Sequence, residues 1–204
     1  MKLKVCGMKY PDNILEVAQL NPDYLGFIFY DQSARFVKEH LPLLPPTIKK
    51  VGVFVNARLE SVIKHVKIHS LQAVQLHGNE SPEFCFALNN ESVEIIKVFS
   101  VDESFNFDIL KNYETVCDYF LFDTKGKLPG GNGYTFNWEI LKKYPSTKPY
   151  FLSGGIGIEE IKTLKEFKSN PASTYCYAID VNSKFELKPG LKDIEQLKLI
   201  KELL

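Results

Sequence analysis

The sequence has few cysteines, no charge excess and no long apolar run, and each of these absences argues against a class of protein. Its four cysteines lie far apart and include no C-x-x-C pair, so we expect reduced thiols in the cytoplasm rather than a disulfide scaffold. The N-terminus has no apolar signal core. No apolar run approaches the roughly 18 residues of a membrane span. These absences predict a soluble cytoplasmic protein.

Charge and metal-ligand clusters are equally sparse. The 25 basic and 25 acidic side chains give a formal net charge of zero, and no basic run is present. Since nucleic acids and anionic membranes attract basic patches, we expect neither as a partner. His65 and His69 have the i, i+4 spacing of metal ligands, but no acidic partner lies between them. We therefore predict no metal site.

Short apolar runs rich in β-branched and aromatic residues recur along the whole chain. Near-continuous apolar runs of this length are typical of parallel strands covered on both faces. We predict eight strands, at residues 3–8, 24–30, 51–55, 73–76, 95–101, 119–122, 150–152 and 175–181. Helical stripes are clearest at residues 59–66, 158–167 and 197–204. Ser81 before Pro82 predicts an N-cap followed by a proline in the first helical turn.

Eight strands that alternate with helix-length segments predict an α/β fold with a closed (β/α)8 barrel, the TIM barrel. The chain has 204 residues, near the roughly 200-residue lower limit of this fold. An open doubly wound sheet is the alternative. No Gly-, Ser- or Pro-rich linker divides the sequence, so we expect a single domain over residues 1–204. The gap between strands two and three contains three prolines, and we expect its helix to be short.

Polar residues gather where the predicted strands end, which is where TIM barrels carry their active sites. Cys6 ends the first strand, His77 the fourth, Asp123 the sixth and Asp180 the eighth. Each has a structural alternative: a lone cysteine is more often a core residue, Asp123 could cap a turn, and His77 could be a structural hydrogen-bonding residue. The other three cysteines are expected in the core.

The segment SGGIG at residues 153–157 is more specific. Gly154 and Gly155 follow the seventh strand and precede a helix expected to begin near Ile158, so backbone N–H groups can approach an anion at a helix N-terminus. In TIM barrels the loops after strands seven and eight commonly bind phosphate. This favours a phosphorylated ligand over the alternative, a tight structural turn. The spacing differs from G-x-G-x-x-G and no Walker lysine is present, so a nucleotide-binding fold is not expected.

The loop after the sixth strand, KGKLPGGNGYTFNW at residues 125–138, is long and rich in glycine. Such a loop can act as a mobile flap over a site, although an idle surface loop is the alternative. A thiol, a carboxylic acid and a phosphate cradle at one rim predict acid–base chemistry on a sugar phosphate.

The order of these motifs resembles the phosphoribosylanthranilate isomerase family over nearly the whole chain. The matching segments are KVCGMK, GFIFYDQSARFV, VGVFVN, QLHGNES, FDT with GGNGYTFNW, SGGI and DVNSKFE. The resemblance implies a TIM barrel that converts N-(5-phosphoribosyl)anthranilate to 1-(2-carboxyphenylamino)-1-deoxyribulose 5-phosphate in tryptophan biosynthesis. It implies an aldose–ketose isomerase, formally an intramolecular oxidoreductase, without cofactor or metal. The partner would be a phosphorylated small molecule, and the assembly a monomer or a homodimer.

The resemblance also implies roles for individual residues. Cys6 would be the general base, Asp123 the general acid, and Arg35 the residue that faces the anthranilate carboxylate. The remaining positions match phosphate segments or the substrate side: Gly154, Gly155, Asn182 and Ser183 for phosphate, His77 and Asp180 for the substrate. Lys4 shares the face of Cys6 one layer deeper. Its charge could lower the pKa of the thiol or could pair with a buried carboxylate.

Two alternatives remain beside this isomerase. One is another phosphosugar barrel enzyme, such as indole-glycerol-phosphate synthase, which would be expected to use lysine and glutamate at the rim. The other is a catalytically silent phosphate-binding barrel, against which the intact set of Cys6, Asp123 and Arg35 argues.

Overall fold

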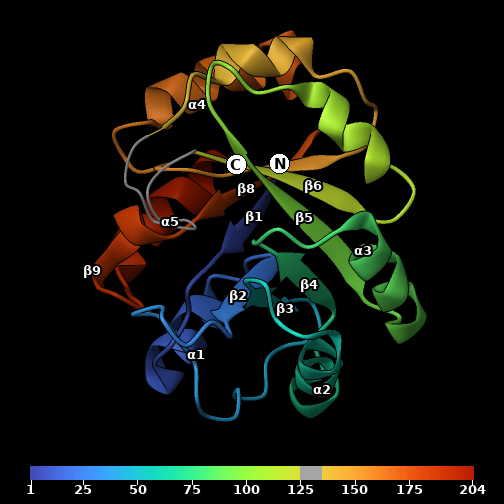
Figure 1. The fold of residues 1–204 in the computed structure, drawn as a ribbon. Helices are drawn as coiled ribbons and strands as arrows, with labels where there is room; N and C mark the ends of the chain where they lie inside the picture. Colours follow the sequence, from blue (N-terminus) through green and yellow to red (C-terminus); the bar gives the residue numbers. More distant parts are fainter. Residues whose placement is uncertain (125–134) are drawn as a thin grey trace.

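A computed structural model describes residues 1–124 and 135–204, and its centre is a closed barrel of eight parallel strands (Figure 1). The strands follow one another around the barrel in chain order, and β8 closes it by pairing with β1. Their bounds are β1 Lys2–Val5, β2 Tyr24–Ile28, β3 Lys49–Phe54, β4 Ala73–Leu76, β5 Glu94–Val101, β6 Tyr119–Thr124, β7 Tyr150–Leu152 and β8 Cys176–Val181. The predicted TIM barrel is confirmed, and the open doubly wound sheet is wrong because β1 and β8 are paired.

The eight strands coincide with the eight apolar runs because each strand is covered on both faces. Alternate side chains point into the barrel, where Tyr24, Val51, Ile96, Leu121 and Phe151 belong to a central cluster. The other face of the strands packs against the surrounding helices in a second, larger cluster. This double coverage explains why the strands are apolar throughout rather than alternating.

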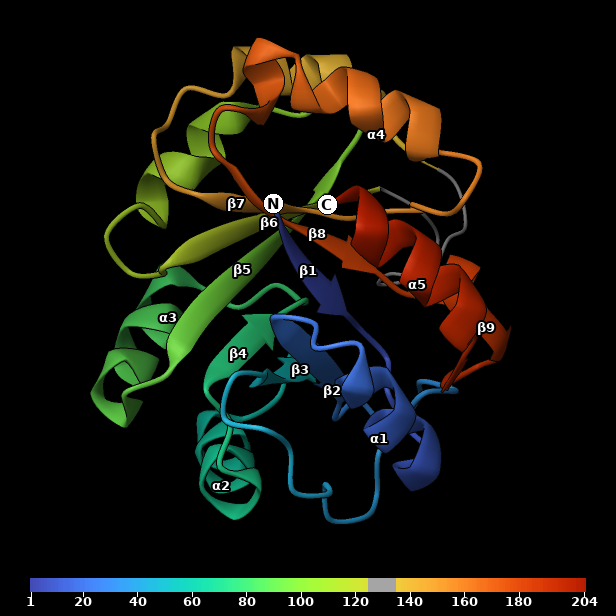
Figure 2. The same ribbon diagram turned by 180° about the vertical axis from the view of Figure 1, so that it is seen from behind.

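Five α-helices surround the strands in the described part of the chain: α1 Pro11–Gln19, α2 Leu59–His69, α3 Pro82–Leu88, α4 Ile161–Lys168 and α5 Ile194–Leu203 (Figure 2). The predicted stripes correspond to α2, α4 and α5. As predicted, Ser81 caps α3, and its hydroxyl accepts the Phe84 N–H at 3.3 Å. The start of α4 differs from the prediction, because a turn precedes it in which the N–H of Ile161 bonds to the carbonyl of Ile158.

The segment 29–48 forms turns and no helix, so the prediction of a short helix there is wrong. Proline cannot donate a backbone N–H, and three prolines fall within seven residues of this segment. A single bridge between Ile28 and Phe36 ties the segment to β2 instead. This leaves residues 30–35 free to fold over the open end of the barrel.

Two connections contain 3₁₀ helices where the alternation predicts ordinary helices. They are η2 Phe107–Asn112, after β5, and η3 Trp138–Lys143, after β6. The single tryptophan, Trp138, is buried in η3, and its ring meets Phe167 of α4 edge-on with the centroids 5.5 Å apart. Residues 125–134 of the predicted flap lie outside the described residues.

A small antiparallel hairpin follows β8, and the sequence did not predict it. It consists of β9 Glu186–Lys188 and β10 Leu191–Lys192, with Gly190 at a positive φ of 85° in the turn. A short 3₁₀ helix, η5 Ser183–Phe185, joins it to β8. The hairpin places two charged residues, Glu186 and Lys192, beside the end of the barrel.

The three remaining cysteines pack in or against the core as free thiols, as predicted: Cys85, Cys117 and Cys176. Burial raises the pKa of Cys85 to about 11 and that of Cys117 to about 12, so both are unreactive near neutral pH. Within residues 1–124 and 135–204, every helix falls short of the length and apolar character that a membrane span requires.

Candidate active site

The C-terminal ends of the strands surround a cavity of about 300 Å³. Side chains two residues apart on a strand lie on the same face. The inward-pointing side chains at the end of each strand therefore point into this cavity. All nine residues proposed from the sequence line it: Cys6, Arg35, His77, Asp123, Gly154, Gly155, Asp180, Asn182 and Ser183. These nine residues come from six of the eight strands and their loops.

Cys6 lies at the end of β1 and is 4% exposed. Its N–H donates to the carbonyl of Val181 at 2.8 Å, which fixes the backbone against β8. Gly26 of the neighbouring strand makes room for the thiol, because a Cβ at this position would lie 2.8 Å from Sγ. Burial raises the pKa of the Cys6 thiol, and Asp180 raises it further, while the charges of Lys4 and Lys192 act in the opposite direction.

Lys4 and Asp180 form a buried ion pair beneath Cys6. Lys4 Nζ lies 2.7 Å from Asp180 Oδ1, and the Ser153 hydroxyl donates to Asp180 Oδ2 at 3.0 Å. Burial alone would lower the pKa of Lys4, but the charges of Asp180 and Cys6, with their hydrogen bonds to the ammonium group, together outweigh burial, so this pKa is raised. Of the two alternatives for Lys4, pairing with a carboxylate is confirmed. Its charge also opposes the rise in the pKa of Cys6, without cancelling it.

Asp123 stands at the end of β6, in contact with His77 of the loop after β4. Its Oδ1 accepts the N–H of Thr124 at 2.9 Å, and its Oδ2 lies 3.2 Å from His77 Nε2, outside hydrogen-bond geometry. On the other side of the ring, Gln75 Nε2 lies 3.2 Å from His77 Nδ1. The His77 ring therefore lies between the Gln75 amide and the carboxyl group of Asp123, the proposed acid. The contact with Gln75 thus influences the orientation of the ring toward Asp123.

The glycine loop after β7 lines the same cavity as Arg35. Gly154 and Gly155 have φ values of +91° and +66°, which only glycine adopts easily. A Cβ on Gly154 would collide with Thr124 Oγ1, so the loop after β7 can approach the end of β6 only because this residue is glycine. The predicted helix start near Ile158 is wrong, and the Gly157 N–H is taken by Glu160 Oε2 at 2.7 Å. The Gly157 N–H is therefore not available to an anion at this loop.

Arg35 reaches the cavity from the segment after β2, and its guanidinium is paired with Glu186 of the β9–β10 hairpin. Arg35 Nη2 donates to Glu186 Oε2 at 2.7 Å, and Nε donates to Oε1 at 2.9 Å. One edge of the guanidinium is therefore held by the protein itself.

No group of three or more His, Cys, Asp or Glu within the described residues is arranged to hold a metal. The rings of His65 and His69 pack against Phe29 with centroids 4.5 and 4.9 Å away. His65 Nδ1 also lies 2.8 Å from the carbonyl of Ser61. These two histidines are packing residues of α2.

The chain is similar to known proteins in sequence and in fold. The family model described as N-(5'phosphoribosyl)anthranilate (PRA) isomerase matches residues 3–202. The chain belongs to this family. An N-(5'-phosphoribosyl)anthranilate isomerase from Parabacteroides distasonis is 44% identical over 207 residues, which cover 97% of this chain and 90% of that protein.

Solved structures of PRA isomerases have the same barrel. The enzyme from Thermus thermophilus superposes with a TM-score of 0.85 at 26% identity, covering 100% of this chain and 98% of its own. A PRA isomerase in complex with reduced 1-(o-carboxyphenylamino)-1-deoxyribulose 5-phosphate superposes with a TM-score of 0.79 at 28% identity, covering 99% and 97%. The resemblance seen in the motifs is confirmed, and another phosphosugar barrel enzyme is no longer a competing interpretation.

Sequence reasoning assigned no role to several polar residues at or behind this PRA isomerase cavity. Gln75 and Ser153 line it, while Glu186 and Lys192 lie behind Arg35. Gln75 could have been found, since it stands two residues before His77 on the same face of β4. The pairing of Arg35 with Glu186 joins residues 151 positions apart, and no local pattern indicates it.

Proposed function

We propose that this chain converts N-(5-phosphoribosyl)anthranilate to 1-(2-carboxyphenylamino)-1-deoxyribulose 5-phosphate in tryptophan biosynthesis. One observation carries the proposal: a buried thiol, a buried carboxyl group and an arginine converge on one cavity at the C-terminal end of a TIM barrel. Membership of the isomerase family supports the same reaction.

The lining of the cavity suggests how this substrate lies. Ile28, Val53 and Val55 form an apolar wall beside Arg35, which suits an aromatic ring whose carboxylate meets the guanidinium. The Gly154 and Asn182 loops, which also line the cavity, suit the phosphate. The ribose then lies between them, within reach of Cys6 and Asp123.

Asp123 acts first, as the general acid. It gives its proton to the ring oxygen of the ribose while the C1′–O bond breaks and the lone pair of the amine nitrogen forms a C1′=N bond. The product is an open-chain iminium ion and an Asp123 carboxylate. The Thr124 N–H, which already donates to Asp123 Oδ1, stabilises the carboxylate that is left.

Cys6 acts second, as the general base. Its thiolate takes the C2′ proton, whose electron pair forms the C1′=C2′ bond of an enolamine. A proton then adds at C1′ as the enol O–H proton leaves, and the ketone results. C1′ is reduced and C2′ is oxidised within one molecule, so the enzyme is an aldose–ketose isomerase of the intramolecular oxidoreductase class. The raised pKa of Cys6 makes the thiolate scarce but strongly basic.

An assay on freshly generated N-(5-phosphoribosyl)anthranilate tests this function. We expect the loss of substrate fluorescence with formation of the rearranged ketose, and no reaction with Cys6→Ala of unchanged fold. Folded protein without turnover would indicate the silent phosphate-binding barrel.

Residues 1–204 would act as one catalytic domain with no metal or organic cofactor. A cytoplasmic location is supported by the four free thiols. The partner is a phosphorylated small molecule, and neither nucleic acid nor membrane is needed for this chemistry. Assembly as a monomer or a homodimer stays a prediction.

A further inference from the structure

We propose that Glu186 and Lys192 are positioning residues that prepare Arg35 to bind the ring carboxylate of the substrate. Both belong to the β9–β10 hairpin, and both lie behind Arg35 rather than in the lining of the cavity. This inference rests on the proposed function, because it concerns how that substrate is recognised.

Glu186 fixes the orientation of the guanidinium. Arg35 Nε lies 2.9 Å from Oε1 and 3.1 Å from Oε2, and Nη2 lies 2.7 Å from Oε2. A guanidinium has two edges that can each hold a carboxylate, one formed by Nε with one terminal nitrogen and one formed by the two terminal nitrogens. Glu186 takes the first edge. The second edge is left for a carboxylate in the cavity, at an angle that the protein sets in advance.

Lys192 fixes Glu186 in turn. Its Nζ donates to Glu186 Oε1 at 2.7 Å and to Asn182 Oδ1 at 2.8 Å, and the N–H of Gly190 donates to the same Glu186 oxygen at 3.1 Å. The Lys192 and Glu186 side chains are 0% and 4% exposed. Such buried contacts hold the carboxylate rigid, so the hairpin is the support on which Arg35 rests.

The charges of these three groups explain why a carboxylate stands next to a carboxylate-binding arginine. Arg35 and Glu186 alone would be neutral as a pair and would attract an anion weakly. Lys192 restores one net positive charge. Burial lowers the pKa of Lys192 to about 8, against the raising influence of Glu186 and Cys6, so the ammonium form still prevails at pH 7. Burial favours the neutral form of Glu186, but Arg35 and Lys192 overcome it and lower the pKa of Glu186.

The same arrangement connects the proposed carboxylate-binding and phosphate-binding groups. Lys192 contacts Asn182, which lines the cavity beside the proposed phosphate loop, and Glu186, which holds Arg35 at the proposed carboxylate end. Anthranilate differs from aniline only in its carboxylate, and the pre-oriented guanidinium is the feature that can distinguish them. Glu186 and Lys192 would thus determine specificity without contacting the substrate.

A pair of ligands tests this inference by calorimetry. The first is reduced 1-(o-carboxyphenylamino)-1-deoxyribulose 5-phosphate, and the second is the same molecule made from aniline, which lacks the ring carboxylate. For the unmodified protein we expect the first to bind on the order of 10–100-fold more tightly, the range for a charge-assisted hydrogen-bonded contact. Glu186→Gln and Lys192→Met should each reduce this ratio about tenfold, with little effect on the aniline ligand.

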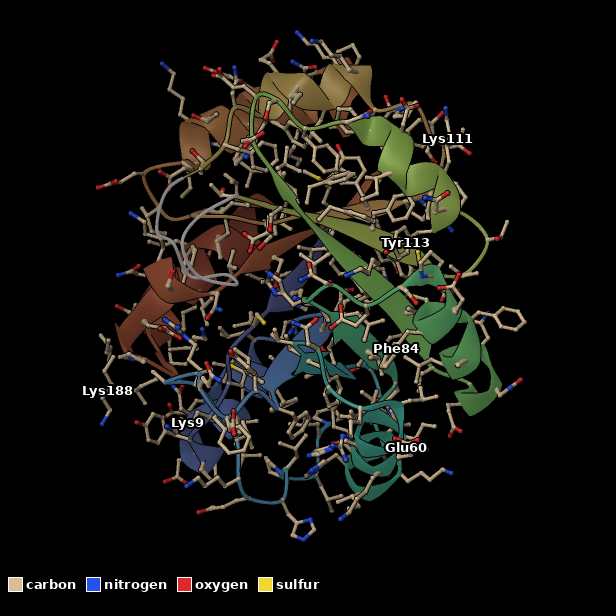
Figure 3. All side chains as sticks on the ribbon, viewed as in Figure 1. Lys9, Glu60, Phe84, Lys111, Tyr113 and Lys188 are labelled. Carbon is tan, nitrogen blue, oxygen red and sulfur yellow. The ribbon has the colours of Figure 1, made fainter. Side chains whose placement is uncertain are left out.

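Lys188→Met is the matched control. Lys188 lies in the same hairpin but is exposed, and Figure 3 shows it pointing away from the barrel, so the ratio should not change. Wild-type ratios in both Glu186→Gln and Lys192→Met would overturn the inference, and so would an equal loss of affinity for the two ligands, which indicates a purely structural role. If Lys192→Met does not fold, Glu186→Gln decides. Failure of the unmodified protein to bind either ligand would instead contradict the proposed function.

Discussion

At the scale of one residue, the burial of Cys6 opposes the role proposed for it, because burial favours the thiol and a base must be the thiolate. Burial in the cavity raises the pKa of the Cys6 thiol and so disfavours the thiolate, and the charge of Asp180 adds to this effect. The positive charges of Lys4 and Lys192 partly offset this rise in the pKa, so a small fraction of the thiol is present as thiolate. A scarce thiolate suits a base that must act only after the iminium ion has made the C2′ proton acidic.

The pH dependence of Cys6 alkylation tests this account. Because the pKa of the thiol is raised, the thiolate should appear only above the ordinary cysteine value of about 8.5. The midpoint of the iodoacetamide rate against pH should therefore lie higher than 8.5, with mass spectrometry to separate Cys6 from the other thiols. Lys4→Met removes a charge that lowers this pKa, so its midpoint should be higher still. A midpoint at or below 8.5 would contradict the raised pKa.

Substitution separates the thiol's chemical role from its packing role. A general base or acid typically contributes roughly 10²–10⁴-fold to a rate, so Cys6→Ala should lose about that much of kcat while its Tm changes little. Asp123→Asn should be similarly inactive, because an amide cannot deliver the proton that opens the ring. Steady-state assays and thermal melts measure both. Near-normal kcat for Cys6→Ala would make the thiol a packing residue.

At the scale of elements, one buried ion pair joins the loops after β3 and β4 to strand β5. Lys97 Nζ lies 3.0 Å from Glu80 Oε2, and Glu80 also accepts the N–H groups of Asn56 and Gly78 at 2.8 and 2.9 Å. Tyr113, labelled in Figure 3, donates to the carbonyl of Glu80 at 3.0 Å. Gly78 follows His77 directly, so this network sets where the proposed substrate-side histidine stands.

Breaking this pair should destabilise the protein strongly. Both side chains are almost fully buried, and removing one partner of a buried pair typically costs about 3–5 kcal/mol. Lys97→Met should therefore lower the free energy of unfolding by about that amount in urea titrations. The control is Lys111→Met, whose pair with Asp108 is exposed to solvent, so the free energy of unfolding should stay almost unchanged. Equal effects of the two changes would contradict the role given to Glu80.

Elements with a clear hydrophobic pattern in the sequence could be predicted. Elements whose conformation depends on contacts with distant parts of the chain could not. The eight strands followed from apolar runs that are buried on both faces, and the Ser81 cap followed from local hydrogen bonding. The choice between an α-helix and a 3₁₀ helix at η2 and η3 depends on how each segment packs on the barrel, which no local pattern encodes. The β9–β10 hairpin has strands of three and two residues, too short to give an alternating pattern.

At the scale of the whole molecule, the barrel gathers the site from residues far apart in the chain. That the nine predicted residues line one cavity could be predicted, because strand ends in a TIM barrel meet at one rim and because the motifs resemble a known family. The position of Glu186 and Lys192 behind Arg35 could not be predicted, since the contact between Arg35 and Glu186 joins distant parts of the chain. Strand topology thus predicts which strand-end residues lie close together, whereas a contact between distant loops is known only from the three-dimensional structure.

A reaction carried by side chains alone should be indifferent to chelators. The described residues contain no cluster arranged for a metal, and the proposed steps use only Asp123 and Cys6. After dialysis against EDTA, kcat and KM should be unchanged relative to a mock-dialysed sample. A loss that added Mg²⁺ or Zn²⁺ restores would contradict the metal-free mechanism.

The single buried tryptophan gives the enzyme its own optical probe. Trp138 follows β6, the strand that ends near Asp123. N-alkylated anthranilates absorb in the near ultraviolet where tryptophan emits, so a bound ligand should quench Trp138 by resonance energy transfer. Titration of the inactive Cys6→Ala protein with substrate would then report occupancy without turnover. Trp138→Phe should abolish the signal while leaving catalysis intact.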